Sequence, residues 1–301
     1  MSETADPEDR SIGEHVTLLG AVRGGKYPHG RSLLVKGSEE AVLIDPSLSL
    51  AGRALLPRVD RVINSHCHED HIAGNHLFPD LPWHLHALDR TGLGSLDGMM
   101  EIYGYAGPSA EYFRKALVED FHYMAKPDAV PFADGDAFDL GGVSLRVIHA
   151  PGHTRGHCCF AIEPDGVLYL GDIELTSFGP YYGDAWSSLA DFERTLAAVR
   201  TLEARRYATF HHIGVLDGRQ AFLERLDRFT AMIHSREQRL VEFLHQPHTL
   251  DEIVAHRFVY RPGDPVPYAD AVERRSMWQH LERLIAAGRV REVEAGRYFA
   301  S

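Results

Sequence analysis

The sequence NSHCHEDHIAGN, residues 64–75, contains three histidines and two acids within six consecutive positions, from His66 to His71. Imidazole and carboxylate groups are donors that bind a divalent transition metal such as zinc. Because side chains alternate along an extended chain, His66 and His68 point to one side and Cys67 points away. If a helix begins near Asp70, the side chains of Asp70 and His71 project toward a second metal. So dense a pattern predicts a metal site rather than isolated surface or core histidines.

Short apolar runs bounded by turn residues predict strands before and after this stretch. They cover residues 32–36, 41–45, 61–64, 83–86, 144–149, 167–172 and 207–210. Segments with helical spacing, 109–124 and 188–204, lie between some of these runs. The pattern predicts a mixed α/β (α+β) fold in which helices cover sheets.

The last third of the chain has a different pattern. A long amphipathic helix is predicted at 217–245, where it bridges two units. In residues 246–301, Thr249 and Glu252 match a capping box, a second helix is predicted at about 268–287, and two short runs, 289–294 and 297–300, suggest a hairpin. The predicted organisation is a flexible N-terminus (1–14), a main domain (15–216), the bridging helix and a small winged-helix-like module (246–301).

Three further motifs follow in the main domain. They are APGHTRGH at 150–157, LYLGD at 168–172 and TFHHIGV at 209–215. Together with residues 64–75, they resemble the metal-binding motifs of the metallo-β-lactamase superfamily. The resemblance covers about residues 15–215 and implies an αββα sandwich, in which two sheets pack face to face, helices lie outside, and the ligand loops gather along one edge.

The resemblance also implies a set of metal ligands. His153 completes a three-histidine site with His66 and His68, and Asp172 bridges to a second site. The last ligand is His211 or His212, and alignment of Gly214 and Val215 with the family pattern favours His212. Asp45, after the run at 41–44, matches a carboxylate that orients the main metal loop. The implied donors are His66, His68, His153, Asp70, His71, Asp172 and His212.

Such a site predicts two divalent ions, with zinc first and iron or manganese as alternatives. Two metals lower the pKa of a bridging water toward neutrality, which supplies a hydroxide nucleophile without a serine or cysteine. Asp70, close to that water, is the predicted catalytic proton shuttle.

An aromatic insertion at about 95–132 separates the two halves of the predicted metal site. It could cover the metals as a lid, or its helices could simply pack. In the first case its aromatic and histidine side chains contact the substrate, and Tyr181 and Tyr182 form a second wall. The candidate substrate-binding residues are Tyr103, Tyr105, His122, Tyr123, Tyr181 and Tyr182.

Composition narrows the class of partner. The formal net charge is -12, and residues 246–301 contain eight arginines and eight acids, so nucleic acid is an unlikely partner. The module is expected to pack against the main domain or to form a homodimer. No run of apolar residues predicts a membrane span, the acidic start does not resemble a secretory signal, and three cysteines do not suggest a disulfide framework. A cytoplasmic protein is expected.

The leading functional hypothesis is therefore a hydrolase of a small-molecule ester, thioester or lactone. A phosphodiesterase or ribonuclease with the same metal site is the nearest alternative, since some winged-helix-bearing relatives cleave RNA. An iron-dependent oxygenase or oxidoreductase of the same fold is another, because these donors also suit iron. A winged-helix regulator that only senses a ligand is a fourth, against which a complete donor set argues.

Overall fold

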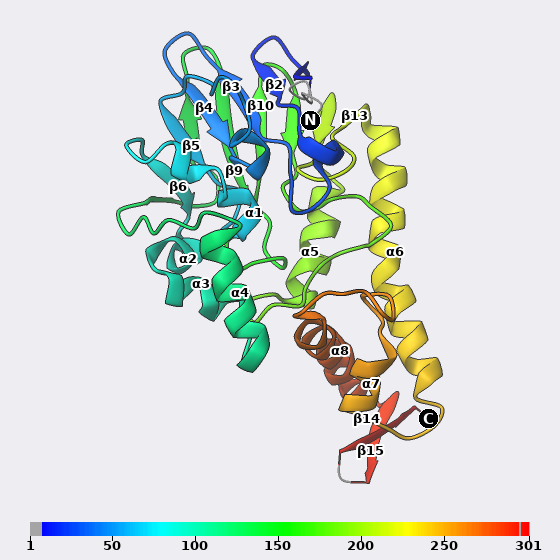
Figure 1. Cartoon of the computed structure of the whole chain (residues 1–301). Coiled ribbons are helices and arrows are strands. Elements are labelled where there is room, and N and C mark those ends of the chain that lie inside the picture. Colours follow the sequence, from blue (N-terminus) through cyan, green and yellow to red (C-terminus); the bar gives the residue numbers. More distant parts are fainter. Residues whose placement is uncertain (1–7, 295, 301) are drawn as a thin grey trace.

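Two sheets form the larger part of the chain in the computed structural model, which describes residues 8–294 and 296–300 (Figure 1). The first sheet has seven strands in chain order: β1 (Arg10–Ser11), β2 (Val16–Leu18), β3 (Leu33–Lys36), β4 (Ala41–Ile44), β5 (Arg61–Ile63), β6 (Trp83–His86) and β7 (Val130–Phe132). The second has six in the order β13 (Val215–Asp217), β12 (Arg206–Ala208), β11 (Val167–Tyr169), β10 (Cys158–Glu163), β9 (Ser144–His149) and β8 (Ala137–Asp139). All seven predicted strand runs are present.

Alternate residues of each strand face the other sheet, because the side-chain period of a strand is two. Val35 and Ile44 on the first sheet share a core with Val147 and Phe160 on the second. The neighbouring residues face outward, as Leu34 does in β3. The sheets are therefore packed face to face on a continuous apolar layer.

Helices cover both outer faces. The outer side of the seven-stranded sheet packs against α2 (Arg90–Gly94), α3 (Leu96–Tyr103) and α4 (Gly107–Glu119). The six-stranded sheet packs against α5 (Leu189–Val199) and the first half of α6 (Arg219–Phe243). This order of layers is the mixed α/β arrangement that the resemblance implied.

The insertion at 95–132 is part of this packing. Phe113 and Leu117 of α4 are buried on the outer face of the sheet, and β7 pairs in parallel with β6. The segment therefore extends the scaffold, and it also places Tyr103 near the metal loop, as described below.

The C-terminal module contains β14 (His248–Thr249), α7 (Leu250–His256), α8 (Ala269–Ala286), β15 (Val290–Glu294) and β16 (Arg297–Ala300). Its three strands form a small sheet in the order β14-β16-β15, and the predicted capping box of Thr249 and Glu252 is present. Leu240 and Leu244, at the end of α6, pack in the core of this module. Figure 1 shows α6 running from the sheets down to the module.

The module docks against the main domain through side chains of α8. The Arg275 guanidinium donates hydrogen bonds to the carbonyls of Tyr103 and Gly104. The Gln279 amide donates to the Tyr182 carbonyl at 2.8 Å and accepts from the Leu189 amide at 2.6 Å. The module thus contacts both the insertion and the loop that precedes α5.

The remaining helices are short. They are α1 (Glu69–Ile72) and the 3-10 helices η1 (Val22–Gly25), η2 (Leu48–Leu50), η3 (Asn75–Leu77) and η4 (Ala87–Asp89). Within residues 8–294 and 296–300, no helix is both long and apolar enough to cross a bilayer.

The prediction that residues 1–14 are flexible can be compared with the structure from residue 8 onward, and it needs correction there. Residues 1–7 lie outside the described part of the chain. Arg10 and Ser11 pair with β2, and Ile12 is buried in the core between the sheets. Backbone pairing and burial of this apolar side chain hold residues 10–12 in place.

Candidate metal centre

Three histidines from two loops form the first half of the site. His66 and His68 follow the end of β5, and His153 follows β9. His68 Nδ1 lies 2.8 Å from His153 Nε2, and the ring centroids of His66 and His153 are 4.8 Å apart. All three side chains are buried, and their nitrogens converge on a small volume.

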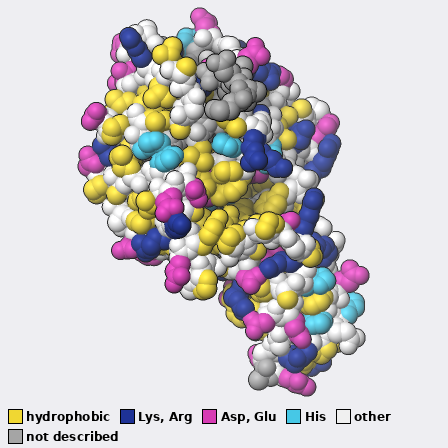
Figure 2. All heavy atoms as spheres, viewed as in Figure 1, with side chains coloured by type: hydrophobic (Ala, Val, Ile, Leu, Met, Phe, Trp, Pro, Cys, Tyr) yellow, Lys and Arg dark blue, Asp and Glu magenta, His cyan; other side chains and the backbone are white. Residues whose placement is uncertain are grey.

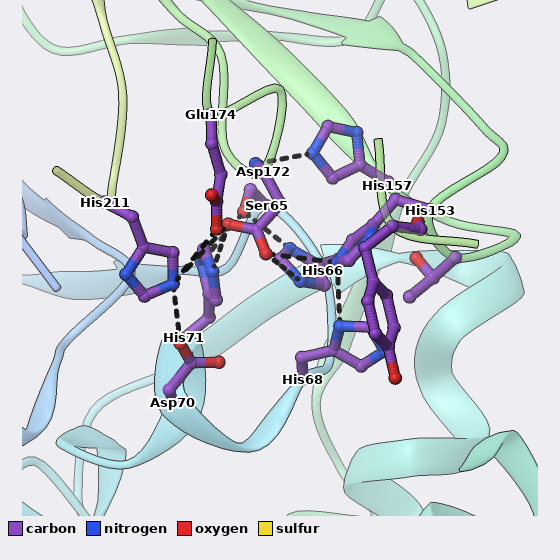
Figure 3. Close-up of polar contacts among 12 residues, drawn as sticks. Ser65, His66, His68, Asp70, His71, His153, His157, Asp172, Glu174 and His211 are labelled. Carbon is purple, nitrogen blue, oxygen red and sulfur yellow. Dashed lines mark hydrogen bonds and ion pairs between the residues drawn. The ribbon is translucent and has the colours of Figure 1, made fainter. Parts of the chain in front are cut away.

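The second half begins with α1, whose first turn carries Asp70 and His71. His211, after β12, places its Nε2 2.8 Å from Asp70 Oδ2. His71 Nε2 lies 2.7 Å from Asp172 Oδ1. Figure 3 shows these groups on one side of Asp172 and the three-histidine group on the other.

Asp172 lies between the two halves, at the turn after β11. Its Oδ1 is close to His71, and its Oδ2 is 3.1 Å from His153 Nε2 and 4.0 Å from His66 Nε2. One carboxylate thus faces both groups of donors, which suits a ligand that two cations would share.

Each imidazole has its other ring nitrogen near a protein group outside the cluster. His66 Nδ1 is 3.0 Å from Ser65 Oγ and His68 Nε2 is 3.1 Å from Asp184 Oδ2. The remaining three contacts are His71 Nδ1 to Asp45 Oδ2, His153 Nδ1 to the Tyr181 carbonyl, and His211 Nδ1 to the Gly25 and His29 carbonyls. Partners of this kind fix the ring and leave the inner nitrogen unprotonated for a metal.

The inner atoms fit a pair of divalent cations. His66 Nε2 is buried, and the described residues offer it no hydrogen bond. Buried polar atoms without partners are costly, and a cation supplies the missing partner. The donors fall into two main sets, His66, His68, His153 and Asp172 in one and Asp70, His71 and His211 in the other, and Glu174 lies with Asp172 and His211 in a third, overlapping group. The cluster is therefore a metal-binding His/Asp site of the dinuclear type.

Charge and burial also suit metal binding. Burial and the neighbouring histidines lower the pKa of His66 well below its usual value, so its imidazole is neutral. Burial alone would raise the pKa of Asp172, but His71 and His153 outweigh it and lower that pKa well below the usual range. Burial lowers the pKa of His68 and His211, but nearby carboxylates outweigh it and raise these pKa values to about 8 and about 10. A neutral imidazole and an ionised carboxylate are the forms that bind a metal, so a bound cation would displace these protons.

The structure corrects the choice between the two adjacent histidines. His211 points into the cluster, whereas His212 is exposed, and its backbone has a φ of 49°. The left-handed backbone at His212 turns the chain just after His211, so only the first side chain reaches the donors. Alignment to the family pattern placed the ligand one residue too late.

Asp45 lies behind the second group of donors. Its side chain accepts hydrogen bonds from the Ser65 amide at 2.6 Å and the Tyr169 hydroxyl at 2.7 Å, and it contacts His71 as described. The loop that carries His66 and the ring of His71 are thus held by one buried carboxylate, the arrangement expected of a group that orients ligands.

Asp89 is a structural residue of the site that the sequence did not indicate. Its carboxylate accepts from the Cys67 amide at 3.3 Å, the Thr154 hydroxyl at 2.6 Å and the Gly156 amide at 2.7 Å. It therefore ties the His66–His68 loop to the His153 loop. No local motif surrounds Asp89, so only the fold reveals this contact.

A cavity of about 780 Å³ opens onto the donors. Of the predicted substrate-binding residues, Tyr103, Tyr105 and Tyr181 line it. The other three lie elsewhere: His122 is exposed beside His76, the Tyr123 hydroxyl donates to the Gly92 carbonyl, and the Tyr182 hydroxyl contacts His280. These three predictions were wrong because helix packing and turns direct the side chains away from the cavity.

The cavity has further walls that were not predicted. They include Tyr27, Glu69, Glu174, Phe178, Asp184, Tyr260 and Tyr268. Glu69 accepts hydrogen bonds from the hydroxyls of Tyr27 and Tyr103, and Asp184 accepts from those of Tyr105 and Tyr181. Tyr260 and Tyr268 belong to the C-terminal module, which therefore contributes directly to the cavity.

Comparison with known proteins agrees with this geometry. A hydroxyacylglutathione hydrolase of Methylococcus capsulatus is 29% identical over 211 residues, which cover 65% of this chain and 70% of that protein. An atrochrysone carboxyl ACP thioesterase of Paecilomyces divaricatus is 35% identical over 88 residues, but these cover only 29% of this chain and 26% of that protein. A solved metallo-beta-lactamase family protein of Thermus thermophilus has the same fold, with a TM-score of 0.72 over 97% of this chain and 100% of that one at 24% identity.

The sequence model of the family described as the metallo-beta-lactamase superfamily matches residues 28–228, which carry every donor of the site. The chain belongs to this superfamily and is a metallo-hydrolase.

Proposed function

We propose that the protein hydrolyses a small ester, thioester or lactone, with two zinc ions at the donor cluster. The observation that carries the proposal is the position of Asp172 between two groups of donors whose outer nitrogens are already held. Among the three substrates we favour a thioester, because the relatives include a hydroxyacylglutathione hydrolase and an ACP thioesterase.

The chain's own residues divide the work. A bound pair of divalent ions supplies a water of lowered pKa and polarises the substrate carbonyl. Asp172, Asp70 and the five histidines of the donor groups would hold these ions. Asp70, which lines the cavity, accepts the proton of the attacking water and returns it to the leaving group.

The walls of the cavity support an organic substrate. Tyr103, Tyr105 and Tyr181 contribute flat apolar faces, and their hydroxyls are engaged with Glu69, Asp184 or each other. Aromatic faces of this kind bind apolar groups and keep water from the reacting centre. This wall favours an acyl compound over an RNA strand.

We also propose that residues 246–301 form a winged-helix-like module in a cytoplasmic protein. The order α6, β14, α7, α8 and the β15–β16 hairpin supports the first point. Cys67, Cys158 and Cys159 are free and buried, as expected in a reducing compartment.

The test is a panel of esters, thioesters, lactones and a phosphodiester, each assayed with and without a chelator. We expect thioester hydrolysis that a chelator abolishes and zinc restores. Metal analysis and a visible spectrum of protein purified without added metal distinguish zinc from iron. Activity on the phosphodiester alone would overturn the proposal.

Asp172→Ala should lose metal and activity together, with at least about a hundredfold fall in kcat/KM, because both donor groups lose their shared carboxylate. Metal content and kcat/KM are measured on the same sample. Asp128→Ala is the control, since that side chain is 77% exposed and belongs neither to the donor groups nor to the cavity lining. Full metal content with normal turnover in the Asp172 variant would contradict the bridging role.

A further inference from the structure

The outer part of the cavity is lined by four cationic side chains, those of Lys26, Arg225, Arg228 and Arg261. They come from three separate parts of the chain: the turn after η1, the first half of α6 and the loop between α7 and α8. Folding therefore gathers positive charge at one opening, although acids outnumber Lys and Arg by 43 to 31 in the whole sequence.

The side chains that line the cavity are buried at one end of it and exposed at the other. The donors at its inner end, such as His153 and Asp70, are buried. Lys26, Arg228 and Arg261 are exposed, and Arg225 is partly exposed. A bound molecule would thus reach the metals with one end and the cations with the other.

These cations have little competition from acids of the protein. Among the described residues, no ion pair involves Lys26, Arg225 or Arg261. Arg228 forms one ion pair, with Glu224, at the long distance of 4.0 Å, and both side chains of this pair are exposed. Elsewhere several exposed arginines are paired, for example Arg200 with Asp227 and Arg274 with Asp251. The cations at the opening are therefore available to an anion that comes from outside.

The space between the two ends is aromatic. Phe178, Tyr260 and Tyr268 line it together with the tyrosines near the metals. Figure 2 shows hydrophobic side chains gathered in the hollow between the large and small parts of the molecule, with Lys and Arg side chains at its edges. The cavity volume of about 780 Å³ is in the range that holds a whole organic ligand.

We propose that Lys26, Arg225, Arg228 and Arg261 form an anion-binding rim, which holds a phosphate or carboxylate on the thiol part of a thioester substrate. The proposal rests on the proposed function. Hydrolysis consumes one water and releases a carboxylic acid and a thiol that carries the phosphate or carboxylate. The rim therefore binds the charged group of the thiol that leaves. Two arginines one turn apart on α6 suit the several oxygens of a phosphate.

The test measures binding of two product-like thiols to the metal-loaded full-length protein by titration calorimetry. Phosphopantetheine and pantetheine differ only in one phosphate, so any contact between their thiols and the metals cancels in the comparison. We expect phosphopantetheine to bind about tenfold more tightly at low salt, because charge-assisted hydrogen bonds are strong. The preference should shrink at about 0.5 M salt, as screening increases.

Arg225→Gln combined with Arg228→Gln should remove most of this preference, and Arg225→Lys with Arg228→Lys should retain much of it. Lys115→Gln with Arg194→Gln is the matched control, since it removes the same charge from exposed sites on α4 and α5. The unfolding midpoint of each variant reports whether it is folded. Glutathione and its diethyl ester form a second pair, which shows whether carboxylates can replace the phosphate.

The proposal of an anion-binding rim would be overturned if phosphopantetheine bound no more tightly than pantetheine and glutathione no more tightly than its diethyl ester. An equal loss of preference in the matched control would also overturn it, because the effect would then follow net charge alone. Failure of the proposed function is a separate result: neither a neutral N-acetylcysteamine thioester nor its charged counterparts would be hydrolysed, whatever the calorimetry showed.

Discussion

Five histidines in the site depend on partners outside it for their orientation. Asp184 is an example: its side chain is buried, held by the hydroxyls of Tyr105 and Tyr181, and placed 3.1 Å from His68 Nε2. A ring fixed in this way loses little conformational entropy when it binds a metal. The surrounding protein groups thus set the geometry of the donors.

The adjacent histidines allow a matched comparison. His211→Ala removes a donor whose Nε2 contacts Asp70, so one of the two metals should bind at least about tenfold more weakly. His212→Ala removes an exposed ring beside the same turn and should leave metal affinity within about twofold. Competition with a chromogenic chelator measures both affinities. A larger effect of the His212 substitution would contradict the assignment.

Among individual residues, the sequence predicted the metal donors that lie within a short motif. His66, His68, Asp70 and His71 are close along the chain, so their spacing alone carries information. Tyr27 and Asp184 reach the site through contacts over long sequence separations, and no local pattern marks them. The choice of His211 depends on a backbone turn that the sequence did not reveal.

Among the helices, α5, α6 and α8 are joined by one group of charges. Arg283 of α8 contacts Glu237 of α6 and, at 2.9 Å, Glu193 of α5. His280 Nδ1 lies 3.3 Å from the same Glu237 carboxylate, and Arg289 lies 3.2 Å from it. These contacts bring the C-terminal module and the main domain together at one carboxylate.

The charges give stability a dependence on pH. The hydrogen bond from His280 and the nearby Arg283 lower the pKa of Glu237 to about 2, while burial opposes them. Because the folded pKa is below the usual 4.5, the contribution is present above about pH 4.5 and is lost as pH falls toward 2. Glu237→Gln should cost roughly 1 kcal/mol at pH 7, after allowance for solvent screening, and less at pH 3.5.

Urea unfolding of the wild type and the Glu237 variant at both pH values measures this difference. Glu242→Gln on the same helix is the control. A difference that stays constant between the two pH values would contradict the role given to the Glu237 carboxylate.

The main strands and helices were predictable because their apolar residues repeat with a clear period. The capping box at Thr249 and the long helix α6 are examples. The strands β1, β7 and β8 have only two or three residues and mostly exposed side chains. Their pairing depends on a neighbouring strand rather than on a local pattern, so the sequence did not reveal them.

For the whole molecule, the C-terminal module completes the cavity. Its loop supplies Tyr260, Arg261 and Tyr268 to the lining. From composition, the module was expected to pack or to dimerise, and its balanced charge gave no sign of a contact with substrate. That contribution arises only when α8 docks on the main domain.

Arg275 tests the importance of docking. Arg275→Met removes the guanidinium donor from the Tyr103 and Gly104 carbonyls, of which, among the described residues, only that of Tyr103 keeps a donor, the Ala185 amide, and it should weaken the interface by about 1–3 kcal/mol. We expect KM to rise several-fold with little change in kcat, and amide hydrogen exchange to increase in residues 257–268. Arg274→Met, on the adjacent exposed position, removes only a pair with Asp251 and is the control. If amide hydrogen exchange became faster in the Arg275 variant but KM did not change, docking of the module would not contribute to substrate binding.

The helix α6 contributes Phe222 and Phe229 to the core beside the six-stranded sheet and Leu240 to that of the C-terminal module. Helix formation is cooperative, so each turn of a continuous helix stabilises the next turn. Melting of the small module would fray α6 toward Arg225 and Arg228, and loss of the larger core would leave Leu240 on an unsupported helix. Heat denaturation should therefore give one calorimetric peak, with both parts unfolding as a single cooperative unit.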